Sequence, residues 1–359
     1  MLTNKANYLV AHGMDVVIVT TDQRGLPSFF ELDPRIRCID LHVNYEENNG
    51  KSFLNKLVHY PLKQYKHKRR LKQLLFREHP DVTISMFCND AHFIPGIKDG
   101  SAKLLEIHFS KFKRMQYGRK GLWRLADWWR SKQDEKTVQR FDKFIVLTEE
   151  DRGYWGALSN IRVIPNALTF STSQVSSLEN KKVVAIGRYT HQKGFERLID
   201  AWNMLAPQFP DWKLDIVGDG EERSGLQRQI QLYGLEQQIA LVSPTRNIER
   251  VYQEASLFVL SSRYEGLPMV LLEAQAFGLP VVSFTCKCGP KDIVEEGVTG
   301  YLVEEGDIQG LARQMAVLMG NESLRKQMGR KAKEASFRYS EETVMKQWLD
   351  MFRCCSLKK

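Results

Sequence analysis

The sequence predicts an α/β protein built from two Rossmann-like domains, and three observations lead to that prediction. The chain has 359 residues, of which 43% are hydrophobic and 26% charged. At about 150 residues per domain, such a chain suits two globular domains and not a disordered or fibrous protein. Short β-branched runs alternate with segments of helical period, which is typical of parallel sheets with crossover helices. A Ser- and Thr-rich stretch without period, residues 167–180, separates two such sets.

The first set begins with a helix over residues 3–12, which Gly13 closes. The expected strands of this set are short apolar or β-branched runs, at residues 16–20, 82–87, 103–109, 143–148 and 161–166. A Rossmann unit normally opens with a strand and a glycine-rich turn before its first helix. We therefore expect the first strand of this sheet to be missing, with about 15 to 20 residues encoded upstream of Met1.

The second set repeats the alternation and is followed by a final helix. Its expected strands lie at residues 181–187, 212–220, 238–243, 255–262 and 279–284. An amphipathic helix starts at Ser340, has two glutamates in its first turn and ends near Cys355. The predicted divisions are an N-terminal domain, a linker, a C-terminal domain, and a helix with tail that crosses back to the first domain. They cover residues 1–165, 166–180, 181–339 and 340–359.

The positive charge is concentrated in the first half of the chain. The formal net charge is +9. Residues 1–175 contain 28 Lys and Arg against 19 Asp and Glu, whereas residues 176–359 contain 24 of each. Eight basic and no acidic residues lie between Lys51 and Lys72, and eight basic residues with one acid, Asp127, lie between Lys111 and Lys132. These two basic segments indicate an interaction partner.

The sequence also bears on the cellular compartment. We find no run of about 18 apolar residues, and the first residues lack the order of basic, apolar and small residues typical of a signal peptide. The six cysteines have neither zinc-site nor disulfide-framework spacing. We therefore expect a soluble, cytoplasmic protein with reduced thiols.

Two cations and two glycines follow the first strand of the second domain. The strand ends at Gly187, and Arg188, Lys193 and Gly194 precede a helix that begins near Phe195. Open α/β sheets bind ligands at the carboxyl ends of their strands. An Arg fork, a Lys point charge and close backbone approach at glycine would suit a diphosphate. The alternative is a solvated turn with two surface cations.

A second constellation lies between Ser261 and Phe284. Glu265 and Gly266 form a turn after a strand, Pro268 opens a helix, and Glu273 follows Glu265 by eight residues. Free N–H groups at that helix end would make an anion site, and one carboxylate could take sugar hydroxyls while the other takes a ribose. The alternative for Glu273 is simple pairing with a lysine, but a carboxylate among apolar neighbours needs hydrogen-bond donors.

These motifs resemble glycosyltransferase family 4. The resemblance lies in GRYTHQKG, in the VGDGEER segment at residues 217–223 and in the E-x7-E of Glu265 and Glu273, and it covers residues 3–352. It implies the GT-B fold of two Rossmann-like domains with a cleft between them. It further implies a nucleotide-diphosphate-sugar donor bound mainly by the C-terminal domain, transfer with retention of anomeric configuration, and no metal or other cofactor.

The resemblance also implies roles for individual residues. Arg188 and Lys193 would neutralise the diphosphate beside Gly187, and Glu273 would bind the ribose. Donor-sugar and base contacts would come from residues at two strand ends, namely Glu265, Gly266, Leu267, Val242 and Ser243. Ser243 stands where the family usually has glycine, and Lys287-Cys288-Gly289 replaces the commoner Gly-Gly before Pro290.

In the N-terminal half, His108 follows a strand and resembles a family histidine that contacts the donor sugar near the reacting carbon. We therefore count His108 with Glu265, Arg188 and Lys193 as catalytic candidates. The alternative for His108 is an ordinary, partly buried residue. Asn166 matches the end of the family's interdomain strand and can be purely structural.

The segment 111–132 interleaves cations with aromatic residues. Trp and Tyr suit a membrane interface, and each Lys or Arg near anionic lipid adds about 1 kcal/mol. The expected docking residues are Lys111, Lys113, Arg114, Trp123, Trp128 and Trp129. Single-stranded nucleic acid could explain the same pattern, but no nucleic-acid motif accompanies it, and we expect no nucleic-acid partner. A solvated helix with inward-packed tryptophans is the third interpretation.

The sequence thus predicts a retaining, metal-independent glycosyltransferase at the inner face of the cytoplasmic membrane. It would move a hexose or N-acetylhexosamine from a UDP-sugar to a lipid-linked or cell-surface glycan, as in polysaccharide, lipopolysaccharide or capsule biosynthesis. The alternatives are a sugar-nucleotide epimerase, a phosphorylase and an inactive nucleotide-sugar-binding protein.

Overall fold

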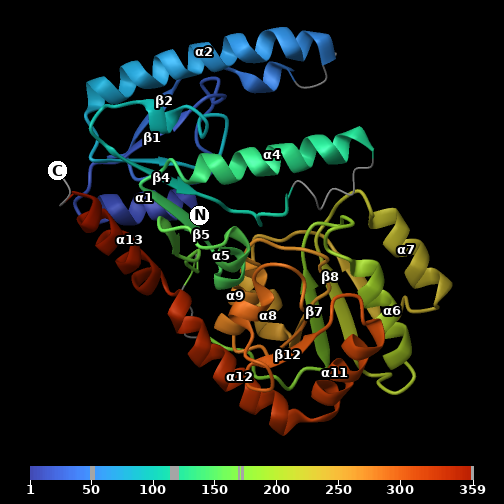
Figure 1. The fold of residues 1–359 in the computed structure, drawn as a ribbon. Coiled ribbons are helices and arrows are strands. Elements are labelled where there is room, and N and C mark those ends of the chain that lie inside the picture. Colours follow the sequence, from blue (N-terminus) through green and yellow to red (C-terminus); the bar gives the residue numbers. More distant parts are fainter. Residues whose placement is uncertain (49–52, 114–120, 169, 171–173, 357–359) are drawn as a thin grey trace.

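The computed structural model describes residues 1–48, 53–113, 121–168, 170 and 174–356. The chain forms two halves, each made of parallel strands with helices packed against them (Figure 1). Within the described residues, no helix combines the length and the apolar character that crossing a membrane requires.

The N-terminal half contains two separate parallel sheets. The first pairs β1 (Val17–Thr20) with β2 (Arg37–Asp40). The second has four strands in sequence order, namely β3 (Val82–Ser85), β4 (Ala102–Glu106), β5 (Lys143–Val146) and β6 (Ile161–Val163). Four of its helices are α1 (Leu2–Ala11), α2 (Phe53–Glu78), α4 (Leu122–Val138) and α5 (Glu149–Trp155). Short 3-10 helices lie at Tyr45–Asn48 and Ile94–Gly96.

All five strand segments predicted for the N-terminal half overlap an observed strand, but β2 was not predicted. Its sequence, RCID, is short and half polar, and its residues are exposed or half-buried. Neither alternation nor an apolar run therefore marks it as a strand. The expectation of a missing first strand remains a prediction.

The C-terminal half is built on one continuous sheet of six parallel strands, in the order β12-β11-β10-β7-β8-β9. These strands are β7 (Lys182–Ile186), β8 (Lys213–Val217), β9 (Ile239–Val242), β10 (Leu257–Leu260), β11 (Val281–Phe284) and β12 (Gly300–Val303). The helices are α6 (Phe195–Leu205), α7 (Arg223–Leu232), α8 (Ile248–Glu254), α9 (Met269–Ala276), α10 (Pro290–Ile293), α11 (Ile308–Gly320) and α12 (Glu322–Ser336). A 3-10 helix, Phe337–Tyr339, follows.

Each face of this sheet carries its own hydrophobic core. Along β7, Val183 and Ala185 belong to one core, which includes α6 and α11, while Val184 belongs to the other, with α8 and α9. This alternation follows from the two-residue period of a strand buried on both faces. The carboxyl ends of β7 and β10, where the two sequence motifs start, are thus held by packing from both sides.

The last helix, α13 (Glu341–Ser356), returns to the N-terminal half (Figure 1). Trp348 on α13 is fully buried in a cluster with Leu104 of β4 and Ile145 of β5. The Leu168 N–H donates to the Tyr339 carbonyl, 2.8 Å away, just before α13. The helix therefore fastens the two halves together. Part of the predicted linker, residues 169 and 171–173, lies outside the described residues.

Candidate functional site

The two halves meet at the loop that carries the first glutamate of the E-x7-E motif. A Cβ atom placed on Gly266 would lie 2.8 Å from the His108 carbonyl oxygen and 3.3 Å from Phe109 Cα. Glycine is required here because no side chain fits between the two backbones. The loop after β10 and the segment after β4 are thus in direct contact, which brings the His108 backbone against the loop that carries Glu265.

Lys193 and Glu265 form an ion pair at the carboxyl ends of β7 and β10. The Lys193 Nζ lies 2.7 Å from Glu265 Oε1, to which the Ser262 hydroxyl also donates at 2.6 Å. The side chains are 18% and 8% exposed. Gly194 makes this approach possible, since its φ is +61° and a Cβ there would lie 2.5 Å from the Ser261 carbonyl oxygen.

Arg188 differs from Lys193 in having no anionic partner. Its side chain is exposed, and within the described part of the chain its guanidinium forms neither an ion pair nor a hydrogen bond. The preceding residue, Gly187, lies against the Lys193 side chain, because a Cβ atom placed on this glycine would lie 3.1 Å from Lys193 carbons. Two cations therefore flank the end of β7, where an anion could bind. Lys193 is paired with Glu265, and Arg188 has no anionic partner within the described chain.

Glu273 is half-buried on α9 and accepts a hydrogen bond from a tyrosine. The Tyr252 hydroxyl donates to Glu273 Oε2 at 2.7 Å. Tyr252 itself is fully buried and stacks on Phe277, with ring centroids 5.3 Å apart. Burial raises the pKa of the Glu273 carboxyl, and the tyrosine hydrogen bond only partly offsets this. The lysine partner considered from sequence is not observed among the described residues, and no local pattern pointed to Tyr252.

The predicted base contacts lie at the end of β9. The Val242 carbonyl accepts from the Gly218 N–H at 2.8 Å and from the Tyr189 hydroxyl at 3.2 Å, while Ser243 is exposed. The VGDGEER segment and the end of β9 are thus joined by hydrogen bonds. Leu267 is 8% exposed and packs into the core beside α9.

A second contact between the halves uses the segment where the chain departs from the family pattern. The Cys288 N–H donates to a Glu150 carboxylate oxygen at 2.9 Å, and the Cys288 thiol lies 3.5 Å from Asp151 Oδ1. Burial raises the pKa of the Cys288 thiol. Asp292 accepts from the Glu149 N–H at 2.6 Å, which fastens α10 to the first turn of α5. The Lys287 ammonium lies 4.6 Å from the centre of the Phe112 ring.

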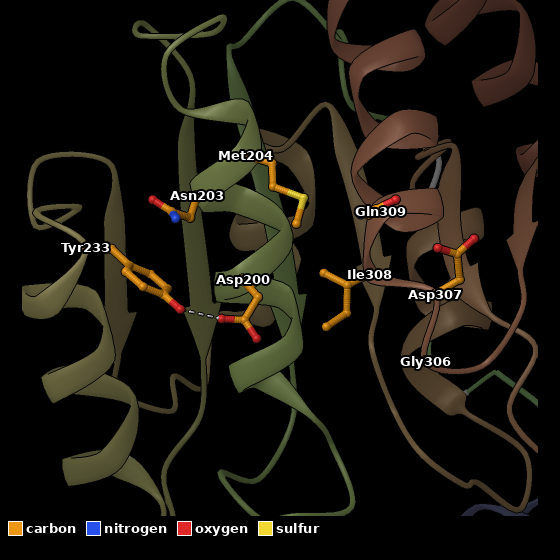
Figure 2. A pocket seen from close by; sticks show the side chains of 8 residues that line it. All are labelled: Asp200, Asn203, Met204, Tyr233, Gly306, Asp307, Ile308 and Gln309. Carbon is orange, nitrogen blue, oxygen red and sulfur yellow. Dashed lines mark hydrogen bonds between the residues drawn. The ribbon is translucent and has the colours of Figure 1, made fainter.

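His108 and Asn166 border a small cavity of about 30 Å³ between the N-terminal half and α13. The His108 side chain is 26% exposed, and its Nε2 atom lies 3.2 Å from Glu106 Oε1. A larger hollow, about 560 Å³, lies elsewhere, between α6 and the start of α11 (Figure 2). No predicted site residue lines this hollow, in which the Tyr233 hydroxyl donates to Asp200 at 2.9 Å. Among the described residues, no group of three or more His, Cys, Asp or Glu side chains could hold a metal ion.

The predicted docking residues differ in their exposure and in their contacts within the protein. Trp128 and Trp129 are 53% and 61% exposed, so these two tryptophans do not pack inward. Lys111 bonds within the protein instead, donating to the Tyr154 carbonyl and pairing with Glu135 at 2.9 Å. We therefore exclude Lys111 from any docking surface. The Lys113 ammonium lies 4.0 Å from the centre of the Phe109 ring. Arg114 and the Trp123 side chain lie outside the described residues.

Comparison with known proteins gives a match over the second half of the chain. Residues 169–335 match the family described as glycosyl transferases group 1. The chain is 37% identical over 220 residues to the amylovoran biosynthesis glycosyltransferase AmsD of Erwinia amylovora. That alignment covers 58% of this chain and 62% of AmsD. The chain thus spans less than two thirds of the length of the curated relatives it matches.

Solved structures match over nearly the whole chain. Sucrose-phosphate synthase of Thermosynechococcus elongatus has a TM-score of 0.81 at 19% identity, covering 100% of this chain and 93% of the synthase. HepE of Anabaena, solved in complex with UDP, has a TM-score of 0.72 at 18% identity, covering 95% and 100%. The fold is GT-B, with two Rossmann-like domains, and the predicted fold class is confirmed.

Proposed function

We propose that this protein is a retaining glycosyltransferase that uses a UDP-sugar and needs no metal ion. The observation that carries the proposal is the arrangement of charge at one edge of the C-terminal sheet. Lys193 and Glu265 pair at 2.7 Å, Arg188 has no anionic partner within the described chain, and Glu273 is half-buried on the next helix. The match of residues 169–335 to glycosyl transferases group 1 supports it.

In this proposal the donor diphosphate binds Arg188 and Lys193. Transfer breaks the bond between the sugar and the diphosphate, so negative charge grows on the leaving group, and cations already in place stabilise that charge. Glu265 and Gly266 face the donor sugar and His108 contacts it from the other half. Glu273 binds the ribose, because a carboxylate whose pKa is raised by burial gains from hydroxyl donors.

The donor is identified by thermal unfolding of the purified chain with UDP-, GDP- and ADP-sugars. A ligand at 100 times its dissociation constant adds about 2.7 kcal/mol of stability. We expect the largest shift with a UDP-hexose or UDP-N-acetylhexosamine, followed by UDP release when a glycan acceptor is added. Product that requires inorganic phosphate would indicate a phosphorylase, an altered free sugar nucleotide an epimerase, and a shift without turnover a binding protein.

We further propose that the N-terminal half docks onto anionic membrane and meets a lipid-linked glycan acceptor there. On α4, both buried acids, Asp127 and Asp134, face inward. The exposed side carries Leu125, Trp128 and Trp129 together with four cations, namely Arg124, Arg130, Lys132 and Lys136. Glu135, which follows Trp128 by seven residues, lies on the same side and pairs with Lys132 at 3.0 Å. The exposed rings and the remaining cations still fit a surface of anionic lipid.

The long helix α2 supports the same proposal. Its outward side chains Leu62, Tyr65 and Phe76 are 62%, 69% and 44% exposed, and Arg69 and Lys72 are also exposed. The spacing of three and four residues places these five on one face of the helix. AmsD is named for amylovoran biosynthesis, and LpsE of Rhizobium meliloti, 30% identical over 201 residues, for lipopolysaccharide core biosynthesis. These names support a membrane-linked glycan as the acceptor class.

A further inference from the structure

Three side chains from distant parts of the sequence meet at the end of β4. Glu106 is the last residue of the strand and is 2% exposed. The Lys5 ammonium, from α1, lies 2.6 Å from both Glu106 carboxylate oxygens. The same ammonium lies 3.5 Å from the centre of the Trp348 ring, on α13. A buried carboxylate is therefore held by a cation that itself rests on an aromatic face.

The fourth member of this cluster is His108. It follows Glu106 by two residues, which places both side chains on the same side of the extended chain. Its Nε2 atom lies 3.2 Å from Glu106 Oε1, but the contact is not aligned as a hydrogen bond. Within the described part of the chain, this buried nitrogen has no other hydrogen-bond partner. Contacts of catalytic groups are often loose without substrate and tighten when it binds.

The electrostatics keep the Glu106 carboxylate charged. Burial alone would raise the pKa of Glu106, but the Lys5 charge and the contact with His108 outweigh it and hold the pKa below the usual value. Burial also lowers the pKa of Lys5, which Glu106 opposes. A fixed, ionised carboxylate next to an imidazole selects which ring nitrogen carries the proton and how the ring is oriented.

We propose that Glu106 is a positioning residue, which orients the His108 imidazole toward the donor-sugar site, and that Lys5 and Trp348 hold Glu106 in place. This inference rests on the proposed function, because only a bound donor sugar would give the His108 imidazole a group on which to act. The His108 backbone contacts Gly266, so the residue that carries the imidazole is anchored at the loop of Glu265. His108 also borders the small cavity between the N-terminal half and α13. Helix α13 follows the C-terminal half in the chain and contributes Trp348 to the cluster. The orientation of His108 therefore also depends on the packing of α13 against the N-terminal half.

The first test is a double-mutant cycle of Glu106→Gln and His108→Ala, with UDP release from UDP-glucose, UDP-galactose and UDP-N-acetylglucosamine as the measurement. We expect each single variant to lower kcat by about 10- to 100-fold, with little change in the donor KM. The double variant should be no slower than His108→Ala alone, because Glu106 acts through His108. Effects that multiply would overturn the proposal, as would a Glu106→Gln variant with the kcat of the parent.

The second test separates positioning from structural support. Lys5→Met alone leaves a buried carboxylate unpaired and should lower the thermal midpoint, whereas Lys5→Met combined with Glu106→Leu removes both charges and should restore it. We expect kcat to stay low in the stable double variant. Recovery of kcat together with stability would show that the pair serves folding only and would overturn the proposal.

A third readout does not need turnover. The imidazole ¹⁵N chemical shifts of His108, assigned with a His108→Asn variant, should change between the parent and Glu106→Gln as the tautomer population changes. Unchanged shifts would overturn the inference even if glycosyl transfer is established. Changed shifts in a chain that turns over no nucleotide sugar would support the contact while refuting the proposed function.

Discussion

The two halves of the molecule share a parallel α/β design but differ in how completely it is built. The C-terminal half has one six-stranded sheet with a core on each face, and its polar site residues are held between packed strands. The N-terminal half has two separate sheets, carries all of the excess positive charge and exposes aromatic rings on α2 and α4. The proposed donor site therefore lies on a rigid, packed scaffold, whereas the proposed acceptor side is an exposed docking surface.

The largest effect on turnover is expected for Glu265→Gln, in the C-terminal half. The substitution keeps the size of the side chain but removes the charge that pairs with Lys193 beside the proposed donor-sugar site, so turnover should fall by about 10²- to 10³-fold. UDP release measures it, and thermal unfolding checks that the fold persists. The matched control is Glu236→Gln, an exposed carboxylate of the same half. Turnover within twofold of the parent would contradict the assigned role.

Gly266→Ala tests whether the halves must touch. The added Cβ would lie 2.8 Å from the His108 carbonyl, so the two backbones must move apart, and a displacement of about 1 Å can cost about 10²-fold in rate. UDP binding, measured by thermal shift, should remain, because the proposed diphosphate and ribose contacts lie in the C-terminal half. Gly225→Ala on α7 is the control, since nothing lies within 4 Å of its added Cβ. An unaffected rate in Gly266→Ala would show that the contact is dispensable.

Trp128→Ser with Trp129→Ser tests the surface half. Both rings are exposed in the protein and would be partly buried in lipid after docking. Removing them should weaken vesicle binding by about tenfold or more. Sedimentation with phosphatidylglycerol vesicles measures binding, which should weaken as salt rises. Leu232→Ser is the control, because Leu232 is 81% exposed on the C-terminal half. Equal binding of the parent to neutral vesicles, or none to either kind, would count against docking.

Glu273→Gln is expected to have the smallest effect and to depend on pH. Burial raises the folded-state pKa of Glu273 above its unfolded value, so its favourable contribution to stability is complete below the unfolded pKa and is lost as pH rises through the folded pKa. The Gln variant should therefore match the parent in acid and exceed it near pH 7.5, by about 1 kcal/mol.

Urea unfolding at pH 4 and pH 7.5 measures this difference. The control is Glu236→Gln, an exposed carboxylate, for which no pH-dependent gain is expected. Donor KM should rise in Glu273→Gln in spite of the added stability, since the proposed ribose contact would be lost. A Gln variant that is less stable than the parent at pH 7.5 would contradict the burial argument.

Local pattern was enough to predict the fold class and most of the strands, but it missed β2, the edge strand β12 and the partners of the charged side chains. Glu273 was singled out from its apolar neighbours, yet Tyr252 lies 21 residues earlier on another helix. Lys5 and Glu106 are 101 residues apart and meet only because α1 packs beside β4. Periodicity records which face of an element is buried, and it contains no information on which distant side chain meets that face.

The alkylation rate of the buried Cys288 thiol reports how often the two halves separate. Because this sulfur lies against Asp151 of the opposite half, a thiol reagent reaches it only when that contact opens. The exposed thiols of Cys38, Cys88 and Cys354 react without such an event. Cys286 and Cys355 are also buried, so the alkylation rate must be followed on the peptide that carries Cys288. That rate counts separations of the two halves, and a nucleotide that bridges them would lower it.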